Sequence, residues 1–456
     1  MAMVAEPIVM PKWIAELRPT LALAVPIMMG QLSQMLMGVT DSMMIGHVGT
    51  VELAAAAFTG AVFGIIFIGC IGLLQPGAVL VARAHGAGDE GLSGIWQRHA
   101  RGLAWAAGLG TAGLMAAGWC FADRFGQPPE VVAVMGPFYL LIALSLVPTL
   151  LFQVDRQFAE ALGRPWEPLA IMLACVGLNV VLNWVLIFGN FGCPKLGLTG
   201  AGVATLTARV LSVVVLRWWL NRRASFSAVQ AAARGARIER GRAKEMLALG
   251  LPMGAALFFE GGAFSAAAVM AGWLGTVQLA AHQIAITCAA TAFMVPLGLS
   301  LGLAVRVGQA VGAGRRETVL PMAAGAAYVT LGTAALSLLV FVLAGEAVAG
   351  SFVKDDPAVV ALAARVLVIV ALFQFFDGLQ VVFAGVLRGL ADVKVPLVVA
   401  FVAYWVVALP VGYWFGVRAG GGLEAIWIGL AGGLAAATLA LGWRLARLTQ
   451  AKSRVA

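Results

Sequence analysis

Three carboxylates interrupt stretches of the chain that are otherwise apolar. They are Asp41, Glu260 and Asp377, and the other acidic residues fall in polar breaks. A charge in the apolar core of a membrane costs at least about 2.5 kcal/mol, so acids there usually face a cavity and carry function. A structural hydrogen-bond partner and a carboxyl group kept neutral by burial are the alternatives.

Glu260 and Asp377 are expected at similar depth. At a helical rise of about 1.5 Å per residue, Glu260 lies about 21 Å into its apolar stretch, and Asp377 lies about 16 Å from Arg388. Two close carboxylates in a low dielectric cannot both stay ionised without a counter-cation. We therefore expect the pair to bind a proton or a hard cation such as Na+, with no intramembrane Lys or Arg at matching depth.

Asp41 is expected to form a separate site. It lies about 34 Å along its helix from Arg18, in the outer half of the membrane. Asn179 and Asn183 are spaced i, i+4, so both side chains lie on one helix face and could offer carbonyl oxygens beside Asp41. Asparagines that join helices to one another are the alternative interpretation.

The elements that must position these residues are membrane-spanning helices. Hydrophobic residues make up 61% of the chain and charged residues only 11%, against roughly 25% charged in a soluble domain. The apolar stretches do not alternate in polarity, which excludes a transmembrane barrel. Hydropathy predicts twelve spans. They lie near 18–43, 53–80, 97–121, 131–153, 167–189, 197–219, 246–271, 279–305, 321–345, 358–386, 396–416 and 424–446.

Basic residues predict how the spans are oriented. With both termini inside, the outer side carries few Lys or Arg, and most of the 30 face the cytoplasm. The outer basic residues are Arg124, Lys195, Lys354, Arg365 and Arg418. The net charge of +9 therefore reflects topology, with no basic face for nucleic acid. Five scattered cysteines indicate neither a disulfide framework nor a metal site.

The chain also repeats itself. A shift of 226 aligns Gly46 to Ala55 with Gly272 to Ala281, and a shift of 228 aligns Pro168 with Pro396. We predict two six-helix lobes, 1–220 and 245–456, joined by a cytoplasmic linker, 221–244. Because each repeat has an even number of spans, a pseudo-twofold axis along the membrane normal relates the lobes.

The acids do not follow the repeat. Asp41 corresponds to Ala267, Glu260 to Gln34 and Asp377 to Thr149. A structural role inherited from the duplicated unit would more naturally occur in both halves. The asymmetry favours a specialised site in each lobe.

Together these features resemble the multidrug and toxic compound extrusion (MATE) family, particularly its NorM branch. The resemblance covers nearly the whole chain. The segments that carry it are Pro26 with Gly30-Gln31 and Asp41-Ser42, Gln75-Pro76, Asn179 to Asn183, Pro252 with Glu260, and Asp377. In this family the fold is an all-α polytopic membrane protein of twelve helices.

The resemblance assigns roles to particular residues. It implies a cation site, possible for Na+, at Glu260 and Asp377 in the C-terminal lobe. It implies a site for cation or drug at Asp41, Asn179, Asn183 and Thr205 in the N-terminal lobe. Phe373 stands where NorM-like proteins often carry a tyrosine one turn before Asp377, so a ring face remains for a cation and the hydroxyl is absent. Further cavity residues are expected at Gln34, Met37, Phe259 and Phe376.

The function that the resemblance implies is secondary active multidrug export. Organic cations and amphipathic drugs would be exchanged for Na+ or H+ by alternating access of two lobes. Such a protein is expected to be a monomer in the bacterial inner membrane, in contact with the lipid bilayer. It is not expected to be an enzyme, to require a cofactor or to bind nucleic acid.

Three other functions would each need a sequence feature of their own. The main alternative is a flippase for lipid-linked saccharides, for which cavity arginines would be expected, and only Arg209 is a candidate. An intramembrane aspartyl protease would need a G-x-G-D or Y-D sequence, and neither occurs. A channel would need a filter-like loop.

Overall fold

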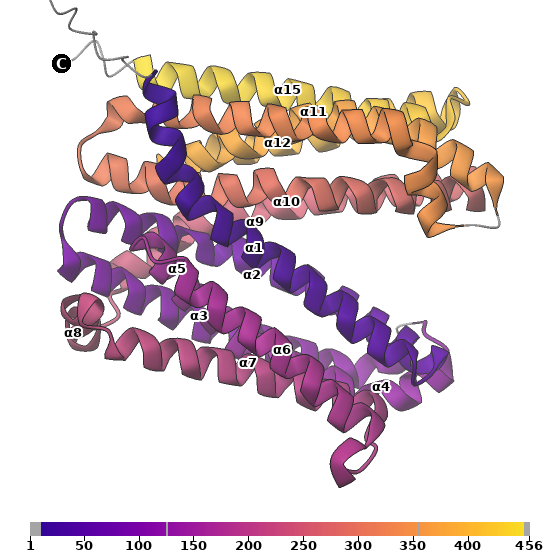
Figure 1. Cartoon of the computed structure of the whole chain (residues 1–456), viewed down its shortest axis with the longest axis horizontal. Coiled ribbons are helices and arrows are strands. Elements are labelled where there is room, and N and C mark those ends of the chain that lie inside the picture. Colours follow the sequence, from indigo (N-terminus) through magenta and orange to yellow (C-terminus); the bar gives the residue numbers. More distant parts are fainter. Residues whose placement is uncertain (1–10, 125, 354–355, 451–456) are drawn as a thin grey trace, which may run out of the picture. The chain divides into compact units, whose positions relative to one another are not determined.

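The computed structural model describes residues 11–124, 126–353 and 356–450, and this part of the chain is almost entirely helical (Figure 1). Within it, 12 helical spans are long and apolar enough to cross a membrane. Each coincides with a predicted span, and most extend a few residues past it, as Lys12–Gly46 does for the predicted 18–43. The fifth, Trp166–Phe188, ends one residue before the predicted 167–189. The prediction of a twelve-span helical membrane protein is confirmed.

Six spans precede the linker. They are α1 (Lys12–Gly46), α2 (Thr50–Gly86), α3 (Glu90–Gly118) with the 3-10 turn η1 (Trp119–Arg124), α4 (Pro129–Leu144) continued by α5 (Leu146–Ala161), α6 (Trp166–Phe188) and α7 (Gly197–Arg222). The turn η2 (Asn190–Gly192) follows α6. Between the two sets of spans lie the turn η3 (Ala224–Phe226) and the short helix α8 (Ser227–Gly235).

The second set begins with α9. It comprises α9 (Arg240–Leu274), α10 (Thr276–Gly312), the turn η4 (Arg316–Thr318) with α11 (Val319–Phe352), α12 (Pro357–Gly389), and α15 (Gly422–Gln450). The eleventh span is composite: α13 (Lys394–Phe401), the π-helical η5 (Val402–Ala408), α14 (Leu409–Gly412) and the π-helical η6 (Tyr413–Arg418). Because this span contains two π-helical stretches, its side chains do not follow the 3.6-residue periodicity of an α-helix.

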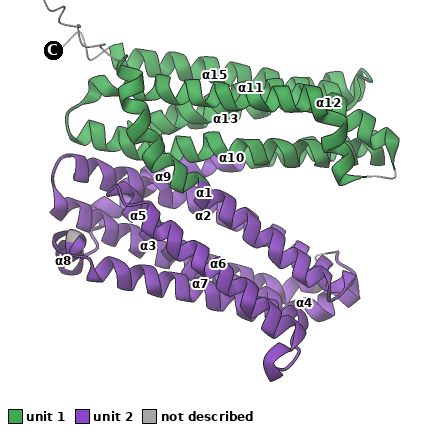
Figure 2. Ribbon diagram, in the orientation of Figure 1, with its two compact units in different colours: residues 1–28, 259–456 green, residues 29–258 purple. Residues whose placement is uncertain are grey.

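The chain divides into two compact units (Figure 2). Unit 1 contains α1 up to Met28 and everything from Phe259 onward. Unit 2 contains residues 29–258. Both α1 and α9 therefore contribute one part to each unit.

Local backbone geometry repeats between the halves. At the end of α2, the N–H groups of Ala87, Gly88 and Asp89 donate to carbonyl oxygens at 3.1, 3.0 and 3.0 Å. At the end of α10, the residues 226 positions later make the equivalent bonds at 2.9, 3.2 and 2.8 Å. Gly88 and Gly314 both have a φ of +75°, the left-handed conformation that closes a helix C-terminus. The duplication is thus visible in the backbone hydrogen bonds as well as in the amino-acid sequence.

A second pair of helix ends matches at a shift of 228. After α5, Gly163 adopts a φ of 77°, and after α12, Ala391 adopts a φ of 58°. The N–H groups of Gly163 and Ala391 each donate to the carbonyl three residues earlier, at 3.0 and 2.8 Å. The second lobe keeps the loop geometry with a residue that has a Cβ.

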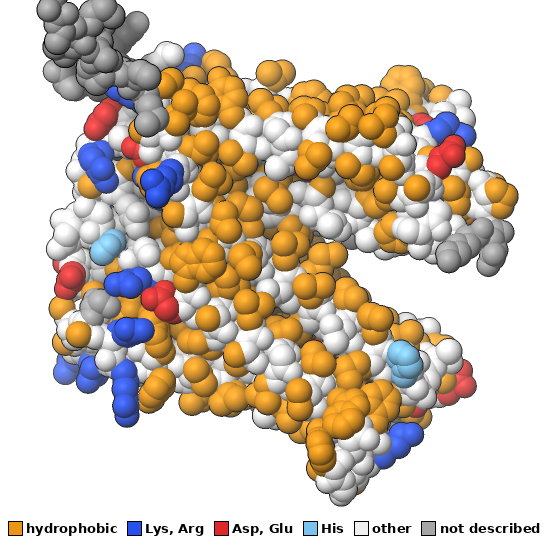
Figure 3. All heavy atoms as spheres, in the orientation of Figure 1, with side chains coloured by type: hydrophobic (Ala, Val, Ile, Leu, Met, Phe, Trp, Pro, Cys, Tyr) orange, Lys and Arg blue, Asp and Glu red, His pale blue; other side chains and the backbone are white. Residues whose placement is uncertain are grey.

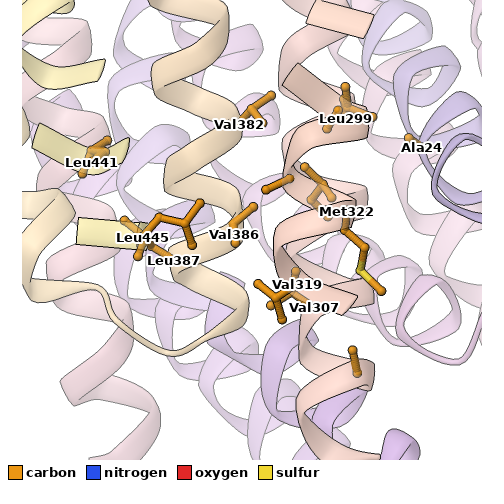
Figure 4. Close-up of a cluster of buried hydrophobic side chains, with 14 residues drawn as sticks. Ala24, Leu299, Val307, Val319, Met322, Val382, Val386, Leu387, Leu441 and Leu445 are labelled. Carbon is orange, nitrogen blue, oxygen red and sulfur yellow. The ribbon is translucent and has the colours of Figure 1, made fainter. Parts of the chain in front are cut away.

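Small and branched apolar side chains form the core of unit 1 (Figure 4). Val382, Val386 and Leu387 of α12 face Leu299 and Val307 of α10, and all are fully buried. Because α12 is packed against α10, α11 and α15, it is the central helix of this unit, and it carries Asp377.

Candidate functional site

Asp41 of α1 is held by α6. The Asn183 side-chain amide donates a hydrogen bond to Asp41 Oδ1 at 2.5 Å, and it also lies 3.3 Å from Asn179 Oδ1. Both asparagines are 0% exposed. The i, i+4 spacing puts both asparagines on one face of α6, but the group that meets Asp41 is the Asn183 amide N–H and not a carbonyl oxygen as the sequence suggested.

Helix α7 supplies the other partners of Asp41. The Thr205 hydroxyl is hydrogen-bonded to the carboxylate, and the Arg209 guanidinium interacts with it electrostatically. Arg209 also donates to Ser145 Oγ at 2.6 Å and lies over the Phe63 ring, 4.6 Å from its centroid. Thr205 and Arg209 are one helical turn apart, so both reach Asp41 from one face of α7.

A pocket of about 240 Å³ opens beside Asp41 within unit 2. Its lining residues are Gln34, Met37, Gly38, Asp41, Phe63, Phe67, Thr149, Phe152, Gln153, Met172, Cys175, Val176, Ala208, Arg209 and Ser212. Asn179, Asn183 and Thr205 do not line it, so they support the carboxylate from outside the pocket. Three aromatic rings with one carboxylate and one guanidinium suit an amphipathic ligand.

The second pair of acids lies in unit 1. Glu260 of α9 and Asp377 of α12 interact electrostatically, and among the described residues no hydrogen bond joins them. Arg388 of α12 also interacts with Glu260. The sequence placed no basic residue at this depth, and that expectation was wrong, because a long arginine side chain reaches well beyond the position of its Cα.

Asp377 is 5% exposed, and its Oδ1 has no hydrogen-bond partner in the described part of the chain. It lines a cavity of about 10 Å³ together with Thr330, Thr333, Ser337 and Gln374. The Thr330 hydroxyl is likewise buried without a partner. A buried polar atom with no partner costs roughly 1 to 3 kcal/mol. A carboxylate and a hydroxyl oxygen orphaned beside a cavity of this size therefore fit one small cation.

Phe373 lies within a cluster of aromatic rings. It is 1% exposed, and its ring meets those of Phe264 and Trp427 edge-on at centroid distances of 6.1 and 5.4 Å. Phe264 in turn meets Tyr404 at 6.0 Å. The ring of Phe373 is therefore enclosed by other rings.

Tyr404 is a polar group of this site that the sequence analysis missed. It is 0% exposed, its hydroxyl has no partner among the described residues, and it interacts electrostatically with both Glu260 and Asp377. It lies in the π-helical η5, so α-helical periodicity does not predict that its side chain faces the acids. The only available signal was its type, one of 4 tyrosines in the chain.

The other two predicted cavity residues also lie in unit 1. Phe259 packs against Phe401 at a centroid distance of 5.1 Å, and its carbonyl accepts from Trp405 Nε1 at 3.0 Å. Phe376 is 37% exposed, and its carbonyl accepts from the Thr438 hydroxyl at 2.8 Å.

In the described residues, no group of three or more His, Cys, Asp and Glu side chains gathers as a metal site would require. What the structure has instead is one acidic site in each unit. Asp377 is buried, whereas Asp41 and Glu260 are half-buried. Such a fold defines a polytopic helical membrane protein that carries acidic side chains within the spans of both units.

The chain belongs to the MatE family. The family model matches it twice, over residues 26–185 and 252–414. The two matches begin 226 residues apart, which is the shift at which the sequence repeats. The family predicted from the resemblance is thereby shown.

Relatives of similar length share about a third of their residues with this chain. A probable multidrug resistance protein NorM of Pseudomonas putida is 37% identical over 454 residues, covering 95% of this chain and 96% of the relative. The multidrug resistance protein PmpM of Pseudomonas aeruginosa is 35% identical over 442 residues, covering 95% and 92%. Among solved structures, the Vibrio cholerae MATE transporter VcmN in its bent form matches the fold with a TM-score of 0.88 at 20% identity, covering 96% of this chain and 98% of that one.

Proposed function

We propose that this protein is a secondary active exporter of cationic and amphipathic small molecules in the bacterial inner membrane. Export is driven by exchange for Na+ or H+ through alternating access. The observation that carries the proposal is Asp377, a buried carboxylate with an unpartnered oxygen beside a cavity the size of a small ion. The names of the relatives, which are multidrug resistance proteins, support the same function.

The mechanism assigns the two acidic sites different tasks. In unit 1, Arg388 offsets one of the two negative charges of the Glu260 and Asp377 pair, and an inward-moving cation neutralises the other. In unit 2, Asp41 and the surrounding rings hold the drug. Antiport requires that each ligand bind differently to the inward and outward states, and the membrane potential adds about 2.3 kcal/mol per charge per 100 mV.

A flippase for lipid-linked saccharides receives less support. Such a protein needs free arginines for pyrophosphate. Arg209 lines the pocket of unit 2, but it is already engaged with Asp41, Ser145 and Phe63.

Efflux from proteoliposomes under separately imposed pH and Na+ gradients tests the proposal. We expect Asp377→Asn and Glu260→Gln each to lower gradient-driven drug efflux by at least about tenfold. An amide side chain carries no negative charge, so it cannot bind and release the driving cation as a carboxylate does. Glu317→Gln, an exposed acid of the loop between α10 and α11, is the matched control and should keep full activity. Undiminished efflux in both acid variants would refute coupling at this pair.

Tyr404→Phe distinguishes the two driving ions. We propose that the Tyr404 hydroxyl provides the oxygen that Phe373 lacks, and Na+ prefers such oxygen ligands whereas a proton needs only the carboxylates. We expect Na+-driven efflux to fall by about tenfold and pH-driven efflux by less than about twofold. The control is Tyr413→Phe in the same span, where Tyr413 is 40% exposed and pairs with Trp273. Equal loss under both gradients would mean that Tyr404 only packs.

A further inference from the structure

A second pocket in unit 2 is built from arginines. It has a volume of about 230 Å³ and lies among α3, α7 and α8. Arg98 and Arg101 come from α3, Arg217 from α7 and Arg234 from α8. No carboxylate is among its lining residues, so the pocket concentrates positive charge.

Asp155 of α5 organises the inner wall of this pocket. It is 0% exposed, accepts from Gln97 Nε2 at 2.7 Å, and is paired with Arg101. Arg217 Nη1 lies 3.9 Å from Asp155 Oδ1, an ion-pair distance too long for a hydrogen bond. This nitrogen is buried and has no hydrogen-bond partner in the described part of the chain. One carboxylate against four guanidinium groups leaves most of the positive charge uncompensated.

The outer wall is the linker helix α8, which is docked firmly on α3. A Cβ on Gly94 of α3 would collide with the backbone of α8 at Val229, so the two helices touch through a glycine. Past α8, the backbone N–H of Glu239 donates to His99 Nε2 of α3 at 2.8 Å. The basic pocket is therefore a fixed feature of the fold and does not depend on a loose loop.

The position along the helices is that of a membrane interface. Arg98 lies about 12 Å from the start of α3, and Arg217 about 8 Å from the end of α7. Trp218 follows directly, is 55% exposed, and has the Arg222 guanidinium 5.1 Å from its ring centroid. Exposed tryptophans beside basic residues mark the headgroup level of a bilayer. In Figure 3, Lys and Arg side chains gather at the end of unit 2 that carries α8, whereas apolar side chains cover its flank.

The rim of the pocket is apolar on one side. Trp105 is 46% exposed and Ile238 58% exposed, and both line the pocket. A ligand that matches this wall carries a compact anion joined to an apolar body. Guanidinium groups bind phosphate oxygens in a bidentate manner, and basic pockets between helices on the cytoplasmic side suit anionic lipid headgroups.

We propose that this arginine pocket binds the phosphate headgroup of an anionic phospholipid of the cytoplasmic leaflet. Arg98 and Arg234 are exposed and engage the phosphate first. Arg217 completes the site with its Nη1, which is within ion-pair distance of Asp155 but makes no hydrogen bond to it. Such a lipid ties α8 and the rest of the linker to the first lobe. Its site is separate from the proposed drug and cation sites.

Lipid retention by the full-length protein tests the proposal. Purified protein would be titrated with phosphatidylglycerol, phosphatidylcholine or inorganic phosphate, with bound lipid counted by native mass spectrometry and stability followed by thermal melting. We expect the wild type to retain phosphatidylglycerol over phosphatidylcholine and to be stabilised by it. Inorganic phosphate should stabilise the protein far less, because it does not contact Trp105 and Ile238.

The decisive variants remove the two exposed pocket arginines. Arg98→Gln with Arg234→Gln should weaken phosphatidylglycerol binding by about tenfold or more, given the contribution of each basic residue near an anionic surface. Arg315→Gln with Arg316→Gln, two exposed arginines of the loop after α10, removes the same charge elsewhere and should change binding by less than about twofold. Equal losses in the two double variants would overturn the proposal, as would equal stabilisation by phosphate alone.

Discussion

Arg209 lies beside Asp41 in the pocket where we propose that the drug binds. Its guanidinium interacts with the carboxylate and covers the Phe63 ring, the two groups that attract a cation in an apolar pocket. As built, the pocket pairs one negative with one positive charge. A cationic drug has to compete with a cation that the protein already supplies.

Arg209→Gln is therefore expected to tighten the binding of a monovalent organic cation such as tetraphenylphosphonium, on the order of tenfold. Asp41→Asn should weaken it by a similar factor, because the variant keeps the like charge and loses the attractive one. Equilibrium binding in detergent measures both. Arg365→Gln, whose side chain is 63% exposed, is the charge-matched control. Weaker binding by Arg209→Gln would mean that the arginine contacts the drug favourably.

The candidate site residues can be predicted from the sequence more readily than the side chains that contact them. Asn179 and Asn183 could be placed beside Asp41 because helical spacing alone puts them on one face. Arg388 and Tyr404 could not be placed, since their reach depends on side-chain length and on a π-helical backbone that no periodicity reveals.

At the scale of elements, the loops that end α5 and α12 differ in one residue. Gly163 adopts a positive φ freely, whereas Ala391 adopts it against contact between its Cβ and the carbonyl oxygen. A left-handed conformation costs an L-residue about 1 to 2 kcal/mol, and the greater freedom of unfolded glycine offsets up to about 1 kcal/mol of that.

Ala391→Gly is expected to stabilise the protein by about 0.5 to 1 kcal/mol, and Gly163→Ala to destabilise it by a similar amount. Thermal melting of the purified variants in one detergent measures both, and each variant is the control for the other. Shifts of the same sign in both would contradict the argument from backbone geometry.

The spans themselves were predictable because hydropathy and helix length are set by the same membrane thickness. Eleven predicted spans lie within the observed ones, and the fifth, 167–189, ends one residue past α6. The ends were too short because helices such as α2 and α10 continue into polar sequence past Arg83 and Arg306. The composite eleventh span and the docking of α8 on α3 depend on contacts between helices, which hydropathy does not report.

At the scale of the whole molecule, the charge asymmetry predicts that the linker faces the cytoplasm and the loop after α6 the outside. A variant with Cys193 as its sole cysteine should be labelled in intact cells by a membrane-impermeant maleimide. A variant with Ser227→Cys as its sole cysteine should be labelled only after the cells are opened. The reverse pattern would invert the topology.

The matched loops at Gly163 and Ala391 show what the two halves have in common. A left-handed turn that suits glycine is present in both halves, although only the first half has glycine there. The acids Asp41, Glu260 and Asp377 likewise have no acidic counterpart in the other half. The halves therefore share a backbone geometry even where their residues differ, so one scaffold can carry two different kinds of site.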